Sequence, residues 1–322
     1  MAPEPGDKLL FLRYVRTFIM TMLTFLGTGG GRFVTLMQER STGGIYLEDK
    51  VKVHIDPGPG ALHALKRNRI DPTQTDCIAV SHCHPDHYAN AEVLIEGMSF
   101  GKKGRAGALF APRSVITGSE KVGPAISRYH QGKLREIVVA KPFDRFRLGD
   151  LEMMATPAVH SDPDCIGMRF VTTNGDVSYV ADTEMREEVI EAHKGARVLV
   201  LATTRPLRSR IPFHLSTEDA ARFASVIRPE LCVLTHLGRR FLRESPKKQA
   251  EWVKARTGVE TVAARDDMKV TMGPRVEVLY MTKPGSYVIK GAHKHRQDAA
   301  CPDREKGPPM AEPPPPQVGG PA

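Results

Sequence analysis

Cysteine is scarce in this 322-residue chain and follows no regular spacing. The five cysteines form an odd, irregular set: Cys77, Cys83, Cys165, Cys232 and Cys301. A disulfide framework needs an even set, so the sequence predicts reduced thiols and a cytoplasmic protein. No internal repeat is evident either, which excludes a solenoid or a propeller.

A long hydrophobic run is also missing. The apolar stretch over residues 9–20 is interrupted by Arg13 and Arg16 and is too short to cross a bilayer. No small-residue cleavage site follows it, so the sequence predicts neither a signal peptide nor a membrane partner. We expect residues 1–21 to form a loose N-terminal extension.

Proline is frequent near the C-terminal end of the sequence, where large apolar residues are few. Residues 292–322 include Pro308, Pro309 and a run from Pro313 to Pro316, a composition that cannot build a core. We expect a disordered tail there. The chain's 41% of hydrophobic residues can fill a core, and its length favours one catalytic domain over residues 22–291 rather than two domains.

One short segment is dense in side chains that bind metals. Within Ser81–His87, the residues His82, His84, Asp86 and His87 follow an apolar run that is typical of a buried strand. Two imidazoles suit one ion, and a carboxylate with an imidazole suits a second. The segment therefore predicts two zinc ions, with manganese or iron as alternatives.

Three further candidate ligands share a common setting. His160, Asp182 and His236 each lie at or just beyond the end of a β-prone apolar run. Several strands can deliver such side chains to one edge of a sheet. Because a two-metal site needs about three more protein groups than the histidine-rich segment supplies, these residues complete the predicted set.

These motifs resemble those of metallo-β-lactamase-fold hydrolases, and most of all the ribonuclease Z-like branch. The resemblance covers most of residues 22–281 and includes segments 25–31, 55–60, 214–220 and 234–241. It implies an α/β fold, the four-layer αββα sandwich. It also implies one ion held by His82, His84 and His160, another held by Asp86, His87 and His236, and a bridging Asp182.

Local patterns agree with two sheets covered by helices on both outer faces. Residues 51–55 alternate like a half-buried strand, and a short helix begins at residue 61. A helical stripe runs over 217–227, where Ser216 or Thr217 can cap the N-terminus. Another helix is predicted over 247–257, ended by a glycine.

The glycine-rich stretch 27–31 resembles a dinucleotide fingerprint only superficially. Residues 32–35 predict no clear helix, and no acidic residue is placed to bind a ribose. A tight turn that lets the backbone approach the metal site, with its N–H groups donating to a phosphate, fits better. We expect Asp56 to orient a ligand histidine rather than bind metal, and Cys83 to point away from the histidines on either side of it.

Two ions about 3.5–4 Å apart can hold a hydroxide that attacks phosphorus or a carbonyl carbon. Asp86 is predicted to accept the proton of that water. The resemblance implies that His214 donates a proton to the leaving group. The alternative is that His214 is only a surface histidine at the start of a helix. The chain departs from ribonuclease Z because Leu215 follows His214, and Leu201 replaces the Glu that supports this histidine. The long arm that grips tRNA is not visible.

Basic residues exceed acidic ones, for a net charge of +9 and a pI near 9.3. They gather at 102–105, 205–210 and 239–243, and the last two clusters flank His214 and His236. We expect these clusters to meet phosphates, which favours nucleic acid, RNA above DNA. No helix-turn-helix or zinc finger is evident. A homodimer remains an open alternative.

The sequence thus predicts a binuclear metal-dependent hydrolase, a phosphodiesterase or nuclease acting on RNA or DNA through a metal-bound hydroxide. A small-molecule hydrolase of the same fold, acting on a cyclic phosphodiester, a lactone or a β-lactam, is one alternative. A nucleic-acid-binding protein without turnover is the other. The full set of seven candidate ligands disfavours a pure binder, which has no chemical need for them.

Overall fold

The computed structural model describes residues 20–101, 106–120, 123–284 and 286–289. The predicted extension over 1–21 therefore lies outside the described residues except for Met20 and Thr21. The predicted tail over 292–322 and the basic cluster at 102–105 lie outside them entirely. None of the helices in the described ranges has the length and apolar character needed to cross a lipid bilayer.

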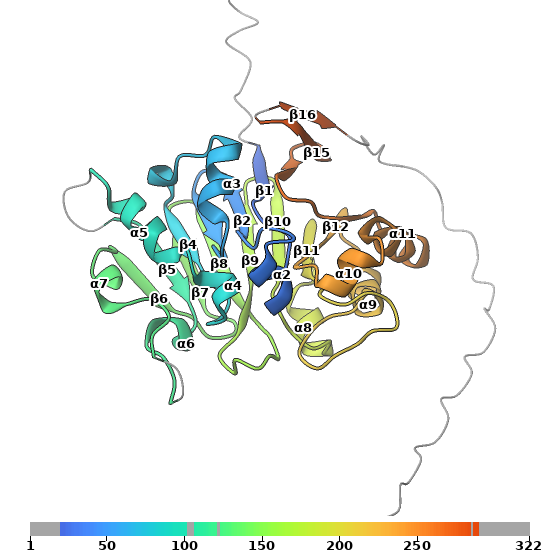
Figure 1. The fold of residues 1–322 in the computed structure, drawn as a ribbon, viewed down its shortest axis with the longest axis horizontal. Helices are drawn as coiled ribbons and strands as arrows, with labels where there is room; N and C mark the ends of the chain where they lie inside the picture. The colour runs from blue at the N-terminus through green and yellow to red at the C-terminus, as the bar shows by residue number, and fades with distance from the viewer. Residues whose placement is uncertain (1–19, 102–105, 121–122, 285, 290–322) are drawn as a thin grey trace, which may run out of the picture. The chain divides into compact units, whose positions relative to one another are not determined.

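Two β-sheets lie face to face (Figure 1). In the described residues the first sheet has nine strands, in the order β16-β15-β14-β1-β2-β3-β4-β5-β6. Their bounds are β1 Thr21–Phe25, β2 Ile45–Glu48, β3 Lys52–Ile55, β4 Cys77–Ala79, β5 Ala108–Ala111, β6 Glu136–Val139, β14 Met268–Met272, β15 Val276–Lys283 and β16 Ser286–Ile289. Strands β3 to β6 are parallel, and the remaining pairs are antiparallel.

The second sheet has seven strands among the described residues, in the order β13-β12-β11-β10-β9-β8-β7. Their bounds are β7 Arg145–Leu148, β8 Leu151–Pro157, β9 Ile166–Thr172, β10 Gly175–Val180, β11 Val198–Ala202, β12 Leu231–Thr235 and β13 Thr261–Ala263. Strands β10 to β13 are parallel, whereas β7 to β10 are antiparallel neighbours. Because β8 and β10 both run opposite to β9, they point the same way.

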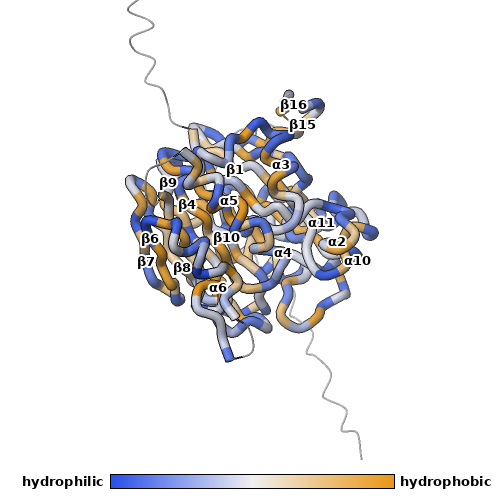
Figure 2. The backbone as a smooth tube through the Cα atoms, turned by 60° about the vertical axis from the view of Figure 1, so that its left-hand side comes forward, coloured by the Kyte–Doolittle hydropathy of each residue, from blue (hydrophilic) through white to orange (hydrophobic). Residues whose placement is uncertain are grey.

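The main core fills the space between the sheets. It includes Phe25 and Phe110 of the first sheet and Met153, Phe170 and Val200 of the second, all nearly or fully buried. Figure 2 shows hydrophobic residues concentrated along the strands inside the molecule. Each such side chain contributes about 1.5–3 kcal/mol on burial, so this layer is a major source of the stability of the fold.

Helices cover the outer face of each sheet. On the first sheet, α3 (Ala61–Asn68) and α5 (Ala91–Ser99) pack their apolar residues on β4 and β5. On the second, α8 (Glu187–Ala192), α9 (Thr217–Ile227) and α11 (Pro246–Thr257) pack on β11 and β12. The shorter helices are α2 Arg32–Met37, η1 Pro72–Gln74, α4 Pro85–Tyr88, α6 Arg113–Ile116, α7 Arg128–Gln131 and α10 Arg239–Arg243. The four layers confirm the predicted αββα sandwich.

Local sequence signals match several of these elements. Ser216 caps α9: its hydroxyl accepts a hydrogen bond from the Asp219 N–H, and the Asp219 carboxylate accepts one from the Ser216 N–H. Gly258 ends α11 in the left-handed conformation, with φ of 72°. The expectation that no helix follows the glycine stretch is wrong, because α2 begins at Arg32. Its six residues carry no side-chain cap and bury only Val34, which explains why the signal was weak.

Strand direction places the candidate ligands at one edge of the sandwich. The carboxyl ends of the parallel strands β10, β11 and β12 share one edge of the second sheet, and β8 ends there too. His160, Asp182 and His236 follow β8, β10 and β12 within a few residues. Ligands can lie outside the carboxyl ends of such strands because the loops there are free to carry polar groups.

Candidate metal centre

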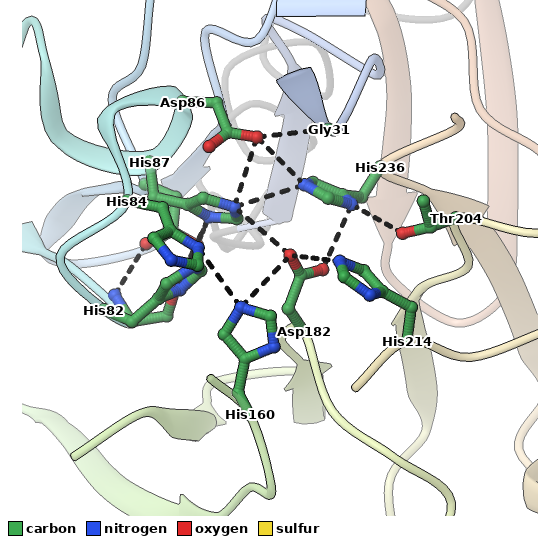
Figure 3. A network of polar contacts seen from close by, with 12 residues as sticks. Gly31, His82, His84, Asp86, His87, His160, Asp182, Thr204, His214 and His236 are labelled. Carbon is green, nitrogen blue, oxygen red and sulfur yellow. Dashed lines mark hydrogen bonds and ion pairs between the residues drawn. The ribbon is translucent and has the colours of Figure 1, made fainter. Parts of the chain in front are cut away.

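The histidine-rich segment joins the end of β4 to the helix α4. His82 and His84 lie in the connecting loop, while Asp86 and His87 lie in α4, whose first residue is Pro85. A proline at this position needs no hydrogen-bond partner for its nitrogen and favours helical entry. The chain therefore turns sharply at Pro85, and the two pairs of candidate ligands point to different parts of one cluster (Figure 3).

Three imidazoles form the first group. His84 Nδ1 lies 3.0 Å from His82 Nε2 and 3.2 Å from His160 Nε2. Ligands on a tetrahedral zinc ion lie about 3.3–3.4 Å apart, because Zn–N bonds are roughly 2.0–2.1 Å long. Ring nitrogens that gather at this spacing around one point have the arrangement that a single ion requires.

A second group faces the first. His87 Nε2 lies 3.1 Å from His236 Nε2, which in turn lies 3.4 Å from Asp86 Oδ2. His87 and His236 are nearly buried, and Asp86 is mostly so. Two imidazoles and a carboxylate are again a donor set that zinc accepts.

Asp182 lies between the two groups. Its Oδ2 is 3.7 Å from His87 Nε2 and 4.0 Å from His160 Nε2. Its Oδ1 is buried and accepts no hydrogen bond from the described residues, although His236 Nδ1 lies 3.1 Å away. A buried carboxylate oxygen without a donor is expensive unless a cation satisfies it. This orphaned oxygen, together with the converging nitrogens, shows that the residues present fit divalent metal.

Asp56 holds the second group in place. Its Oδ2 accepts hydrogen bonds from His87 Nδ1 at 2.8 Å, Ser81 Oγ at 2.7 Å and Tyr179 OH at 2.8 Å, and its Oδ1 accepts one from the Ser81 N–H at 2.7 Å. The proton on His87 Nδ1 leaves Nε2 with its lone pair toward the cluster. Asp56 thus orients the candidate ligand His87, in the supporting position expected from the sequence.

Other contacts orient the remaining rings. His160 Nδ1 donates to the Phe213 carbonyl at 3.1 Å, which leaves Nε2 to face the cluster. His236 Nδ1 hydrogen-bonds with Thr204 Oγ1 at 3.0 Å, and His82 Nδ1 with Ser81 Oγ at 2.9 Å. A carbonyl can only accept, and the Ser81 hydroxyl already donates to Asp56, so these contacts place the proton on Nδ1 of His160 and His82 and leave Nε2 free to bind metal.

Burial keeps two of the histidines neutral. It holds the pKa of His82 well below its usual range, and the neighbouring His87 and His160 add to the effect. Burial likewise lowers the pKa of His160 to about 4. Burial also disfavours the charged form of His87, but Asp56 and Asp86 outweigh it and raise the pKa of that ring well above its usual range. A metal ion at this group therefore competes with a proton.

The glycine stretch lies against the cluster. The Gly31 N–H donates to Asp86 Oδ2 at 3.1 Å. A Cβ on Gly30 would lie 2.3 Å from the His236 ring, so only glycine leaves room for this imidazole. His236 itself has a positive φ of 54°, which turns its ring out of the line of β12. The predicted close approach of this backbone to the candidate metal site is therefore present.

His214 lies at the rim of the cluster. Its Nε2 is 3.7 Å from Asp182 Oδ2, and its side chain is 22% exposed, which leaves it open to a substrate. Its Nδ1 donates to the Pro212 carbonyl at 3.0 Å. Leu201 is fully buried in β11 and supplies no carboxylate. The Pro212 carbonyl therefore fixes the ring, a role for which the resemblance implied a glutamate.

Sequence reasoning missed Asp162, a carboxylate that ties two ligand-bearing loops together. Asp162 Oδ2 accepts from the Cys83 N–H at 3.0 Å and from Ser114 Oγ at 2.6 Å. It therefore links the loop after β4 to the loop after β8. Its position two residues after His160 was the only available signal. Cys83 belongs to none of the candidate metal groups and packs beside the core under α3 and α5, as expected.

The basic clusters are only partly available to a ligand. Arg205 binds Ser209, Arg210 pairs with Asp219 at 2.6 Å, Arg239 with Glu39 at 2.7 Å and Arg240 with Glu244 at 2.8 Å. Arg208 and Arg243 are exposed. The positive charge on this side of the molecule is thus smaller than the sequence count suggested.

Comparison with known proteins identifies relatives of this arrangement. A model of the β-lactamase superfamily domain matches residues 52–237. An uncharacterized protein of Methanocaldococcus jannaschii is 36% identical over 78% of this chain and 94% of its own length. A ribonuclease Z of Bacillus velezensis is 23% identical over 78% of this chain and 98% of its own length. The solved metallo-β-lactamase-fold protein YhfI of Bacillus subtilis, 18% identical, superposes with a TM-score of 0.66 over 79% of this chain and 99% of its own, and so shares the fold.

The close contact at Gly30 generates a test. Gly30→Ala should push the His236 ring out of the cluster and weaken binding of a divalent metal by about 10–100-fold, as loss of a supporting contact typically does. Isothermal titration with zinc measures this. Gly123→Ala is the control, since nothing lies within 4 Å of its added Cβ and it lies in none of the candidate metal groups. Equal zinc affinity in wild type and Gly30→Ala would contradict the crowding described here.

Proposed function

The chain belongs to the β-lactamase superfamily and is similar to its ribonuclease Z-like branch, and we propose that it is a binuclear metal-dependent phosphodiesterase that cleaves RNA. The observation that carries this proposal is the pair of donor groups with Asp182 between them and the imidazole of His214 beside Asp182. Seven converging ligands and an exposed imidazole serve hydrolysis, whereas a binding protein needs neither. The ribonuclease Z relative supports a nucleic-acid substrate.

In this proposal His82, His84 and His160 hold one ion, and Asp86, His87 and His236 hold the other. Asp182 lies between the two groups, within 4.0 Å of His160 and 3.7 Å of His87, and would contribute to holding both ions. Zinc suits these ligands best, with manganese or iron as alternatives. When bound, two such ions would supply a water with its pKa lowered to about 7 and positive charge beside the scissile phosphate.

The chain's own residues move the protons. Asp86 accepts the proton of the attacking water. Burial opposes its ionisation, but His87 and His236 outweigh burial and hold the pKa of this carboxyl below its usual range, so the group is ionised. The Gly31 N–H keeps Asp86 in position. His214 donates a proton to the departing oxygen through Nε2, because its Nδ1 is engaged with the Pro212 carbonyl.

Two exposed positive charges at the edge of the candidate metal centre favour RNA over a small substrate. Arg208 is exposed in the loop that follows β11, and Arg243 is exposed at the end of α10, the helix that follows β12. The carboxyl ends of both strands lie at the edge that carries the candidate ligands. Exposed guanidinium groups at that edge can bind phosphates on either side of the cleaved bond. A cyclic phosphodiester or a lactone would have no use for them.

The ligand assignment predicts the metal content of variants. His84→Ala and His236→Ala should each lower the stoichiometry from two ions per chain and abolish turnover, while the fold persists because neither ring fills the core. Plasma mass spectrometry with circular dichroism measures both properties. His63→Ala, an exposed histidine on α3, is the matched control. Full metal content in the two site variants would refute the assignment.

The proposed role of His214 predicts a dependence on the leaving group. His214→Ala should keep both metals and lose on the order of 10²–10⁴ in kcat for RNA. The loss should be much smaller for bis-p-nitrophenyl phosphate, because p-nitrophenolate departs without a proton. Steady-state kinetics on both substrates is the measurement. Equal losses would mean that His214 positions the substrate and does not protonate it.

The RNA proposal predicts a dependence on salt. Affinity for single-stranded RNA should fall with ionic strength, and the double change Arg208→Ala and Arg243→Ala should lower the slope by about one unit per lost contact. Hydrolysis of bis-p-nitrophenyl phosphate should hardly change. Arg256→Ala is the control, because Arg256 is exposed near the start of β13, at the opposite edge of its sheet. If the affinity for RNA did not depend on ionic strength and the protein hydrolysed a lactone rapidly, a small-molecule hydrolase would be favoured instead.

A further inference from the structure

A cavity of about 210 Å³ lies beside the candidate metal centre. It is lined by Glu184, Met185, Arg210, Ile211, Pro212, His214 and Asp219. His214 belongs to both places, since its Nε2 lies 3.7 Å from Asp182 Oδ2. The cavity is smaller than the roughly 300–1,000 Å³ of pockets for drug-sized ligands, so it suits a single ring system adjacent to the reacting group.

The polar groups of this cavity are held in place before any ligand arrives. Arg210 Nη2 donates to Asp219 Oδ1 at 2.6 Å, and Asp219 is itself fixed by the cap of α9. Glu184 Oε1 accepts from the Phe213 N–H at 3.3 Å, and its Oε2 accepts from Arg186 Nη2 at 2.8 Å. A carboxylate has about four acceptor sites, so Glu184 retains capacity for another donor.

The charge of the lining argues against an anion. Both carboxylates are paired with a guanidinium, Asp219 with Arg210 and Glu184 with Arg186. A phosphate would therefore meet no excess of positive charge here. Met185, Ile211 and Pro212 supply apolar surface between these groups. The cavity is therefore suited to a flat, neutral group that combines an apolar face with N–H donors at its edge.

We propose that this cavity binds a nucleobase of the substrate, next to the phosphate that is cleaved. Glu184 accepts hydrogen bonds from the N–H groups of the base, and Arg210 donates to its ring nitrogen or carbonyl oxygen. A guanine presents both kinds of edge, and arginine and carboxylate side chains recognise bases in these ways. This assignment rests on the phosphodiesterase function proposed above, and it makes the loop before α9, together with Glu184 in the loop after β10, the part of the chain that selects the base.

Binding of free nucleosides to the full, zinc-loaded chain tests the site without any turnover. Guanosine, adenosine, cytidine, uridine and ribose are titrated by saturation-transfer NMR against wild type, Ile211→Trp and Glu184→Gln. Ile211 is 37% exposed, so the Ile211→Trp chain can still fold, and its larger side chain can fill the cavity. Val93→Trp, at an exposed apolar position on α5, is the matched control. We expect guanosine to bind best, Ile211→Trp to weaken it at least tenfold, and Glu184→Gln to reduce the preference over uridine.

Kinetics separates this site from the function on which it rests. For a guanosine-containing dinucleotide, Ile211→Trp should lower kcat/KM at least tenfold, against less than threefold for bis-p-nitrophenyl phosphate. Nucleoside binding that survives Ile211→Trp, or affinities equal to that of ribose, would overturn the base site while leaving the phosphodiesterase proposal intact. Nucleoside binding that Ile211→Trp abolishes, in a chain that hydrolyses no phosphodiester, would support the base site and overturn the function.

Discussion

The buried carboxylate of Asp56 connects the two sheets to the candidate metal centre. It follows β3 directly and accepts hydrogen bonds from the Ser81 backbone and hydroxyl after β4, from His87 in α4, and from Tyr179 in β10 of the other sheet. A buried charge is tolerated only when its lone pairs are satisfied, and here four donors satisfy it. The contact with Tyr179 joins the two sheets, and the contact with His87 orients a candidate ligand.

The chemistry of the centre depends on where strands end. Loops at the carboxyl ends of β4, β8, β10 and β12 bring seven candidate ligands together, and the glycine stretch after β1 closes the opposite side. The sheets themselves contribute rigidity, because their facing residues are almost completely buried. Substrate choice is a matter for the loops, since the same scaffold can carry different chemistries when its loops differ.

The loop between β11 and α9 shows how this chain departs from ribonuclease Z without losing the arrangement. Leu201 packs in the core where a glutamate was implied, and a backbone carbonyl holds His214 instead. The same loop positions His160 through the Phe213 carbonyl, although φ of 65° at Phe213 is unfavourable for an aromatic residue. This loop orients His160 and His214 and lines the cavity beside them, which explains why such strain is tolerated.

Sequence alone determined the fold class, through a resemblance between motifs. It also predicted the candidate ligands and the helices that correspond to α3, α9 and α11, because these have local signatures. Alternation, a capping box around Ser216 and the spacing of His82, His84, Asp86 and His87 are properties of neighbouring residues. Only the tertiary structure decided how these parts meet. The support of His214 by Pro212, the crowding of His236 by Gly30 and the pairing of Arg210 with Asp219 depend on backbone turns and on strand neighbours. Spacing along a chain does not encode those distances, because they follow from how the whole core packs.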